Sequence, residues 1–223
     1  MSKLLETAKE NLSFLLICIL MALALVAVAR IAEHFLPPKR KVSPTRRITL
    51  IAICSAIATV LHLLDFPLPF LAPGFYKLDF SELPVLLCSF YLGPSAGVVC
   101  EGMKILLKLL TKGTSTAFVG DFANFVVGCT LVLPAAICYH VKKTKKTALL
   151  GLALGTVIMT IFGSLFNAVY LLPKFSVLFG LPLDQIVAMG SSINGQIHSV
   201  STLVLFSVAP LNLLKAAVVS LLT

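Results

Sequence analysis

Ionisable side chains lie inside one of the apolar stretches of this sequence, at a spacing that allows them to pair. Glu101, Lys104 and Lys108 follow one another at intervals of three and four residues, so on a helix they share one face. A charge inside a bilayer costs about 3 kcal/mol or more, which makes these residues candidates for a functional site. The alternative role is structural: an internal ion pair, with lysine side chains that extend to the membrane interface. This structural role is favoured for Lys108, whereas the functional and structural roles are equally supported for Glu101 and Lys104.

Two asparagines lie within other apolar stretches. Asn124 and Asn167 fall in two different expected spans. Each amide offers donors and an acceptor, which suits the imide edge of a flat heterocycle. Amides also join helices to one another in membrane bundles, and on chemistry alone this second interpretation is favoured.

The motifs of common catalytic sites do not occur in the sequence. There is no HExxH metal motif, no GxSxG nucleophile elbow and no zinc-type pair of cysteines. A Walker A loop is also missing, so active transport would require an ATPase partner. We therefore expect no enzyme, no metal and no resident cofactor. An intramembrane enzyme that uses Glu101 and Lys104 is the alternative from a different functional class.

The composition indicates that these residues belong to a membrane protein. Of the 223 residues, 58% are hydrophobic and 12% are charged, and the mean hydropathy is +1.02. A soluble domain carries about 25% charged residues. A membrane-spanning helix needs about 20 apolar residues, so the chain has room for six or seven spans. We expect an all-α integral membrane protein with no soluble domain attached.

The pattern of apolar runs and helix breakers predicts the individual elements. The expected helices are 12–35, 48–64, 83–92, 95–110, 118–139, 148–172 and 186–222, the last with a break at Asn194-Gly195. Residues 66–84 contain too many prolines for a helix, and Asp79 or Ser81 can cap the helix that follows. Because this loop is apolar and aromatic, we expect it to pack over something. Residues 173–185 are predicted to form a second loop.

The positive charges cluster in two short segments and predict the topology. They are Lys39, Arg40, Lys41, Arg46 and Arg47, and then Lys142, Lys143, Lys145 and Lys146. The positive-inside rule places both segments in the cytoplasm, which puts the N-terminus and the loop 66–84 outside and the C-terminus in the cytoplasm. Basic residues are not interleaved with aromatic ones, so the net charge of +9 does not indicate nucleic-acid binding.

Several segments in a fixed order resemble the substrate-binding subunit of energy-coupling factor (ECF) transporters, specifically the riboflavin type. They read FPLPF, KLDFSELP, LGPSAGVVCEGMK, GDFANFVVG, VLPAAICYH, KKTKK, GTVIMTIFGSLFNAVYLLP and VAPLNLLKAAVVS, and extend over residues 47–222. The resemblance implies a six-helix vitamin-binding domain at 47–223, preceded by an extra transmembrane helix and basic linker at 1–46. It also implies a bacterial plasma membrane, riboflavin as the transported ligand, and a complex with a scaffold transmembrane subunit and two ATPase subunits.

The resemblance assigns roles to particular residues. It places Asn124 and Asn167 near the ligand, which reverses the preference stated above. Leu78, Asp79 and Phe80 are implied to line a lid. The small-residue pair Ala52-x-x-x-Ala56 matches the motif that docks the scaffold subunit of the family, and small residues at this spacing allow close helix contact.

A riboflavin ligand would need further partners. The ribityl hydroxyls require polar groups, for which Glu101, Lys104 or Asp79 are candidates, and the ring can stack on an aromatic side chain. The aromatic candidates are Phe75, Tyr76, Phe80 and Tyr170. Two alternatives to riboflavin binding stay open: a subunit for another vitamin or a purine-like ring, and a passive structural or assembly protein.

Overall fold

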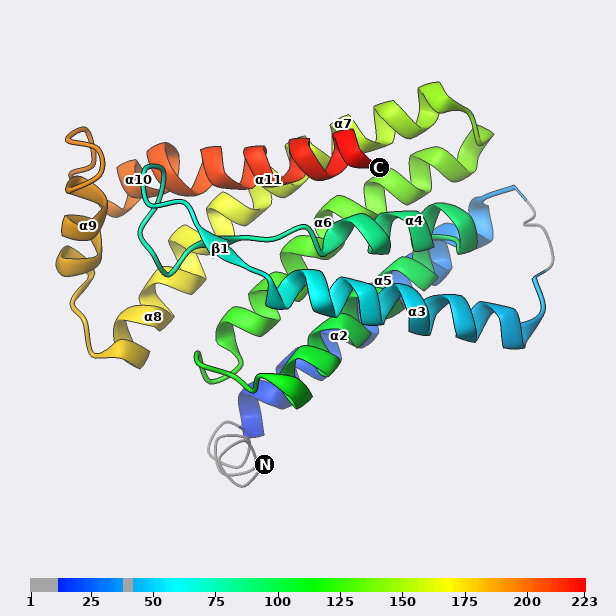
Figure 1. Ribbon diagram of the computed structural model, residues 1–223, viewed down its shortest axis with the longest axis horizontal. Coiled ribbons are helices and arrows are strands. Elements are labelled where there is room, and N and C mark those ends of the chain that lie inside the picture. Colours follow the sequence, from blue (N-terminus) through cyan, green and yellow to red (C-terminus); the bar gives the residue numbers. More distant parts are fainter. Residues whose placement is uncertain (1–11, 38–41) are drawn as a thin grey trace.

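The computed structural model is a bundle of helices crossed by one long loop (Figure 1). It describes residues 12–37 and 42–223. Lys39, Arg40 and Lys41 of the first basic segment lie outside the described residues. Five described segments are long and apolar enough to cross a membrane, namely Cys18–Phe35, Pro44–Leu63, Val119–Lys142, Lys145–Val177 and Val200–Leu222. The predicted all-α membrane fold is confirmed.

The helices begin where the sequence supplies caps and breakers. The first are α2 (Leu12–Phe35), α3 (Pro44–Leu63), α4 (Glu82–Leu92), α5 (Pro94–Thr111), α6 (Val119–Lys142) and α7 (Lys145–Phe166). The Ser43 hydroxyl caps α3, and Thr144 forms a capping box with Thr147 at the start of α7. Gly93, with a φ of 110°, makes the sharp turn between α4 and α5.

The loop between α3 and α4 has a short hairpin at its base. Strand β1 (Phe66–Pro67) pairs antiparallel with β2 (Lys77–Leu78). At the end of the loop the Oδ1 atom of Asp79 accepts a hydrogen bond from the Ser81 backbone N–H at 2.9 Å. Ala72 and Tyr76 are buried in an apolar cluster with residues of the C-terminal third of the chain. The loop therefore packs on the bundle, as its apolar composition predicts.

The prediction of a loop at 173–185 is wrong for most of that segment. Helix α7 continues through a π-helical turn, η1 (Asn167–Leu171), into α8 (Leu172–Phe179). Pro173 is tolerated because it lies in the first turn of α8, and Gly180 ends that helix with a φ of 62°. A separate helix, α9 (Leu183–Ser191), follows. Only the turn between α8 and α9 is non-helical.

The last apolar stretch forms a continuous helical segment after a break. It consists of α10 (Val200–Leu203), η2 (Val204–Val208) and α11 (Ala209–Leu222). The predicted break at Asn194-Gly195 falls within the non-helical residues before α10 and is confirmed. Both π-helical turns interrupt long helices, and such turns occur often at functional sites.

Helix α6 lies at the centre of the bundle and packs against α4, α5 and α7. A Cβ atom added at Gly151 or Gly155 of α7 would meet the backbone oxygen of Ala135 or Leu131 at 2.7 or 2.6 Å. These two glycines therefore let α7 approach the α6 backbone closely. Helix α2 is peripheral and contacts α5 and α6.

The described parts of the two basic segments lie at the same end of the bundle. Arg47 donates a hydrogen bond from Nη2 to the Ser95 hydroxyl at 2.9 Å, which joins the start of α3 to the start of α5. His140, near the end of α6, bonds the Ser89 carbonyl of α4 through Nε2 at 3.0 Å. The α6–α7 turn therefore lies on the same side as Arg47, while the loop containing β1 and β2 crosses the opposite half (Figure 1).

Candidate functional site

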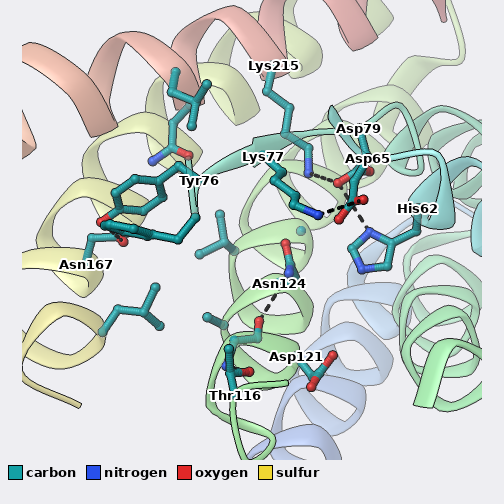
Figure 2. Close-up of a pocket in the computed structure, with 18 of the residues that line it drawn as sticks. His62, Asp65, Tyr76, Lys77, Asp79, Thr116, Asp121, Asn124, Asn167 and Lys215 are labelled. Atoms are coloured by element: carbon teal, nitrogen blue, oxygen red, sulfur yellow. Dashed lines mark hydrogen bonds and ion pairs between the residues drawn. The ribbon is translucent and has the colours of Figure 1, made fainter. Parts of the chain in front are cut away.

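A cavity of about 250 Å³ lies beneath the α3–α4 loop, between α6, the α7–η1 segment and α11. Its wall combines amides, charged groups, aromatic rings and aliphatic side chains (Figure 2). The lining residues used below are His62, Phe75, Tyr76, Asp79, Asn124, Gly128, Asn167, Leu171, Phe175, Asn212 and Lys215. Polar and charged side chains make up more than half of the lining, and apolar ones such as Met159, Leu171 and Leu211 lie among them.

The two predicted asparagines both line this cavity, from different helices. Asn124 donates from Nδ2 to the Gly120 carbonyl of its own helix at 3.1 Å. Asn167 donates from Nδ2 to the Gly163 carbonyl at 2.8 Å and accepts at Oδ1 from the Tyr76 hydroxyl at 3.0 Å. These bonds stay within one helix or go to the loop, so they do not join two membrane helices. The geometry favours the ligand-facing interpretation of both residues.

The last part of the loop, from Lys77 to Phe80, contributes alternate residues to the cavity. Lys77 and Asp79 line it, whereas Leu78 and Phe80 do not. Successive side chains of an extended segment point to opposite sides, and this alternation turns Leu78 and Phe80 away. Phe80 packs instead against the buried cluster around α4. The expectation that all of residues 78–80 line the lid is therefore corrected to Asp79 alone.

Tyr76 and its neighbour Phe75 provide aromatic surface on the loop side. Both line the cavity, with ring centroids 4.5 Å apart. Burial raises the pKa of the Tyr76 phenol, so its hydroxyl remains a hydrogen-bond donor to Asn167. Phe175 of α8 meets Phe75 edge-on at 6.1 Å. Three rings from two segments therefore border one side of the cavity.

Tyr170 does not line the cavity and is corrected as a site residue. It is half-exposed and stacks on Phe166, with ring centroids 5.1 Å apart. The cause is the π-helical turn that begins at Asn167. Its wider turn advances fewer degrees per residue, so Leu171 rather than Tyr170 returns to the face that carries Asn167.

Asp79 is held by two cationic or polar partners at the cavity wall. Its Oδ2 atom lies 3.0 Å from Lys215 Nζ and 3.2 Å from His62 Nδ1. Burial alone would raise the pKa of Asp79, but the Lys215 ammonium and His62 hold that pKa well below its usual range. The carboxylate is therefore ionised and joins the loop to α3 and α11.

The ion pairs continue from Glu82, which also lines the cavity, into the interior of the bundle. Lys215 also lies 3.0 Å from Glu82 Oε1. Lys104 is 3.4 Å from the same atom and 2.5 Å from Glu101 Oε1, and it donates to the Ser81 hydroxyl at 3.0 Å. The predicted pairing of Glu101 with Lys104 is confirmed, while Lys108 pairs with Asp121 instead. The network links α4, α5 and α11 in the interior of the bundle.

Glu101 and Lys104 are fully buried and do not line the cavity. A Cβ atom added at Gly128 would collide with the Glu101 carboxylate, so Glu101 lies directly behind the wall that Gly128 forms. The expectation that these two residues face ribityl hydroxyls is corrected. Their position supports the structural ion-pair interpretation, because each charge is compensated inside the bundle.

Two polar residues of α11 line the cavity although they were not singled out from the sequence. They are Asn212 and Lys215, and among the described residues Asn212 Nδ2 is a buried donor with no hydrogen-bond acceptor. Their spacing of three residues places them on one helix face. The sequence does carry a signal for both residues, because polar side chains three residues apart inside an apolar stretch indicate a functional site.

Ala52 and Ala56 lie on the outer face of α3, away from the cavity. Both are exposed, as are their neighbours Ile53 and Ile57 at about half of their surface. Ser55, by contrast, is buried against α5, where its hydroxyl donates to the Cys100 carbonyl at 3.3 Å. Helix α3 therefore carries an outward strip of small and aliphatic residues that no described helix covers.

Comparisons with known proteins agree on one family. The family model described as "ECF transporter, substrate-specific component" matches residues 46–223. The chain is 32% identical over 176 residues to the riboflavin transporter FmnP of Bacillus subtilis. This alignment covers 78% of this chain and 86% of that protein. The chain is 33% identical over 183 residues to the riboflavin transporter RibU of Staphylococcus aureus, covering 82% and 89%.

A solved structure agrees with the sequence relatives. It is described as the S component of a bacterial ECF transporter, and it superposes with a TM-score of 0.62 at 34% identity. The match covers 81% of this chain and 92% of the solved chain. The region that the family model matches, residues 46–223, includes every element that borders the cavity.

Proposed function

This chain belongs to the family of ECF transporter substrate-specific components, and we propose that it is the riboflavin-binding subunit of a vitamin importer. In this role it captures riboflavin on the outer side of a bacterial plasma membrane and delivers it together with a scaffold subunit and two ATPase subunits. Riboflavin is the transported ligand and not a cofactor. The match of the family model from residue 46 supports dividing the chain into an extra helix with its linker, 1–46, and a vitamin-binding domain, 47–223.

The observation that carries this proposal is the convergence of three amides on one cavity. Asn124, Asn167 and Asn212 approach it from α6, the start of η1 and α11. The imide edge of the flavin ring has carbonyl acceptors flanking an N–H donor, and amide side chains can complement both. The free Nδ2 of Asn212 offers a donor that a flavin carbonyl would satisfy.

The remaining groups suit the other parts of the ligand. Phe75, Tyr76 and Phe175 supply rings beside which the flavin ring system can lie. Asp79 is an ionised acceptor at the wall and, with Lys215, can bond ribityl hydroxyls. Val127, Met159, Leu171 and Leu211 add apolar surface on which a flat ring can pack.

Other functions fit the molecule less well. A subunit for a different vitamin or a purine-like ring is not favoured, because the relatives reported above are named riboflavin transporters. An intramembrane enzyme built on Glu101 and Lys104 is not favoured either, because both side chains are sealed behind the cavity wall. A transport role follows from the family.

Titration of flavin fluorescence tests the proposal directly. Riboflavin added to the purified chain should lose fluorescence with a saturable curve and a stoichiometry of one, because stacking on aromatic rings quenches the flavin. Thiamine and adenine, added in excess, should not displace it. Displacement by either compound, or a linear curve without saturation, would show that the cavity serves another ligand.

A further inference from the structure

Helix α2 lies outside the region that the family model matches, yet it is tied to the core. The Glu33 carboxylate accepts a hydrogen bond at Oε1 from the Ser95 backbone N–H, at 2.8 Å, in the first turn of α5. The first N–H groups of a helix have no partner within the helix, so Glu33 supplies one from a neighbouring helix. Helix α2 is thereby fixed against α5, and the surfaces that the two share are part of the fold.

Nearer its N-terminal end, α2 leaves a groove of about 330 Å³ between itself, α5 and α6. The floor of this groove is apolar and buried, and consists of Ile105, Phe118, Phe122 and Phe125. Among the described residues, its lining shares only Asp121 with that of the cavity beneath the loop, and the three amides of that cavity do not border it. The groove is therefore a second, distinct surface.

The groove opens towards the bilayer and not towards water. Ile19, Leu23 and Leu106 line it and are each more than half exposed. Ile19 and Leu23 belong to a candidate membrane span, so their exposed surfaces face hydrocarbon. Whatever enters the groove therefore comes from the membrane interior.

The chemistry of the wall excludes a polar ligand. Among the described residues of the wall, the charged side chain is Asp121, and its two oxygens are already bonded to Lys108 at 2.5 Å and to the Thr114 hydroxyl at 2.7 Å. A sugar or a flavin would leave its polar groups without partners here. An alkyl chain needs no such partner, and it restores the dispersion contacts that the apolar floor otherwise lacks.

We propose that this groove is a binding site for one acyl chain of a membrane phospholipid. A helix of a partner protein is about 10 Å wide, so it cannot enter a gap between two helices that contact each other and could only lie over the mouth of the groove. An unbranched acyl chain is flexible and narrow enough to follow the gap between α2 and α5. The bound lipid would seal the extra helix to the vitamin-binding domain.

Gly102 offers a substitution that fills the groove without disturbing the fold. It lines the groove, and a Cβ atom added there would meet only Phe125 Cε2 within 4 Å, at 3.6 Å. Gly102→Leu therefore occupies the space intended for the acyl chain. Ala22→Leu fills the groove from the α2 side, and Ala27→Leu, on an exposed part of α2 that does not line the groove, is the matched control.

The test uses the full chain in phosphatidylcholine vesicles that contain a trace of phosphatidylcholine with a photoreactive diazirine in its acyl chain. After illumination, labelled peptides should concentrate in residues 18–26 and 102–125. Each filler should lower this labelling at least five-fold relative to the parent, and Ala27→Leu should leave it unchanged. Helical circular dichroism and monodisperse elution verify that each variant is folded.

Three outcomes would overturn the proposal. Labelling spread evenly over all exposed apolar faces would show that lipid contacts are unspecific. Labelling that survives both fillers would place the lipid elsewhere. Labelling of the isolated chain that disappears when the scaffold subunit is bound would show that a protein side chain fills the groove in the assembled transporter.

Discussion

At the scale of single residues, the cavity depends on amides whose hydrogen bonds are incomplete. Asn124 and Asn167 each use Nδ2 within their own helix, while an Oδ1 atom has two lone pairs and can accept from a ligand. The two side chains lie on separate helices around the same space (Figure 2). Either asparagine can therefore be substituted to test its role without disrupting a contact between membrane helices.

We expect Asn124→Ala or Asn167→Ala to weaken riboflavin binding by about one to two orders of magnitude. Loss of one buried hydrogen-bond partner costs about 1–3 kcal/mol, and 1.4 kcal/mol corresponds to a factor of ten in Kd. Fluorescence titration of each purified variant measures the change, and an unaltered unfolding transition is the control. Parent-like affinity in both variants would assign the asparagines to the bundle and not to the ligand.

A second prediction at this scale concerns the sealed ion pairs. Lys104→Met leaves Glu101 without its cationic partner, and breaking a buried pair from one side costs about 3–5 kcal/mol of unfolding free energy. Adding Glu101→Gln removes the uncompensated charge, so the double variant should recover at least half of that loss. Unfolding followed by circular dichroism in denaturing detergent measures both. If the single variant is as stable as the parent, Glu101 is already neutral in the bundle.

At the scale of elements, the loop carrying β1 and β2 connects the cavity to three helices. The Tyr76 hydroxyl bonds Asn167 at the end of α7, and Asp79 bonds His62 of α3 and Lys215 of α11. A loop held at several points covers the cavity as one unit. Its opening would break these contacts together, and we propose on this ground that the loop governs the exchange of ligand.

Tyr76→Phe tests this role. The phenol positions the Asn167 carbonyl, so its loss should raise the Kd for riboflavin about three- to ten-fold, the equivalent of one neutral hydrogen bond. The change should appear as faster dissociation in stopped-flow measurements, together with faster amide exchange in residues 66–80. Tighter binding would mean instead that Tyr76 competes with the ligand for Asn167.

Helices and breaks were predictable from the sequence because composition and periodicity determine them locally. The sequence-based prediction of the elements failed where a local signal, such as a proline, was overridden by the surrounding helix geometry. Pro173 indicated a loop, but the π-helical turn before it places this proline in the first turn of α8, where its missing N–H has no cost. The same turn rotates Tyr170 away from the cavity, a shift that α-helical periodicity cannot reveal.

The candidate site was predictable to a similar degree. Asn124, Asn167, Asp79 and Tyr76 line the cavity, because their polar or aromatic character in apolar surroundings is visible in the sequence. The long-range packing of α5 against α4 and α6 decides that Lys104 and its partner Glu101 face the interior of the bundle. No spacing rule indicates which side of the wall a charged pair occupies.

At the scale of the whole molecule, the distribution of positive charge predicts the orientation of the chain in the membrane. Arg47 and the α6–α7 turn lie at one end of the bundle, and the loop over the cavity crosses the opposite half. The positive-inside rule then places the cavity mouth outside, the C-terminus in the cytoplasm and the N-terminus outside. A subunit that captures a vitamin from the medium needs this arrangement.

Cysteine labelling of intact cells tests the orientation. A membrane-impermeant maleimide should modify Gly74→Cys, where an added Cβ meets nothing within 4 Å, and should spare Thr144→Cys in the α6–α7 turn. Permeabilised cells should allow both to react. The six native cysteines are buried or half-buried, so the parent chain provides the background. Protection of Gly74→Cys together with labelling of Thr144→Cys would invert the topology.

The last prediction concerns assembly with a scaffold subunit, for which the outward strip on α3 is the proposed contact. Ala52 and Ala56 are exposed and one helical turn apart, so another helix can approach the α3 backbone closely there. Replacing both by Phe should abolish co-purification with the scaffold and riboflavin uptake, while the affinity of the isolated subunit stays at the parent value, because neither residue lines the cavity. Ala153→Phe, at an exposed alanine of α7, is the control and should assemble normally. If the double variant assembles and supports uptake, the scaffold must dock on another face of the bundle.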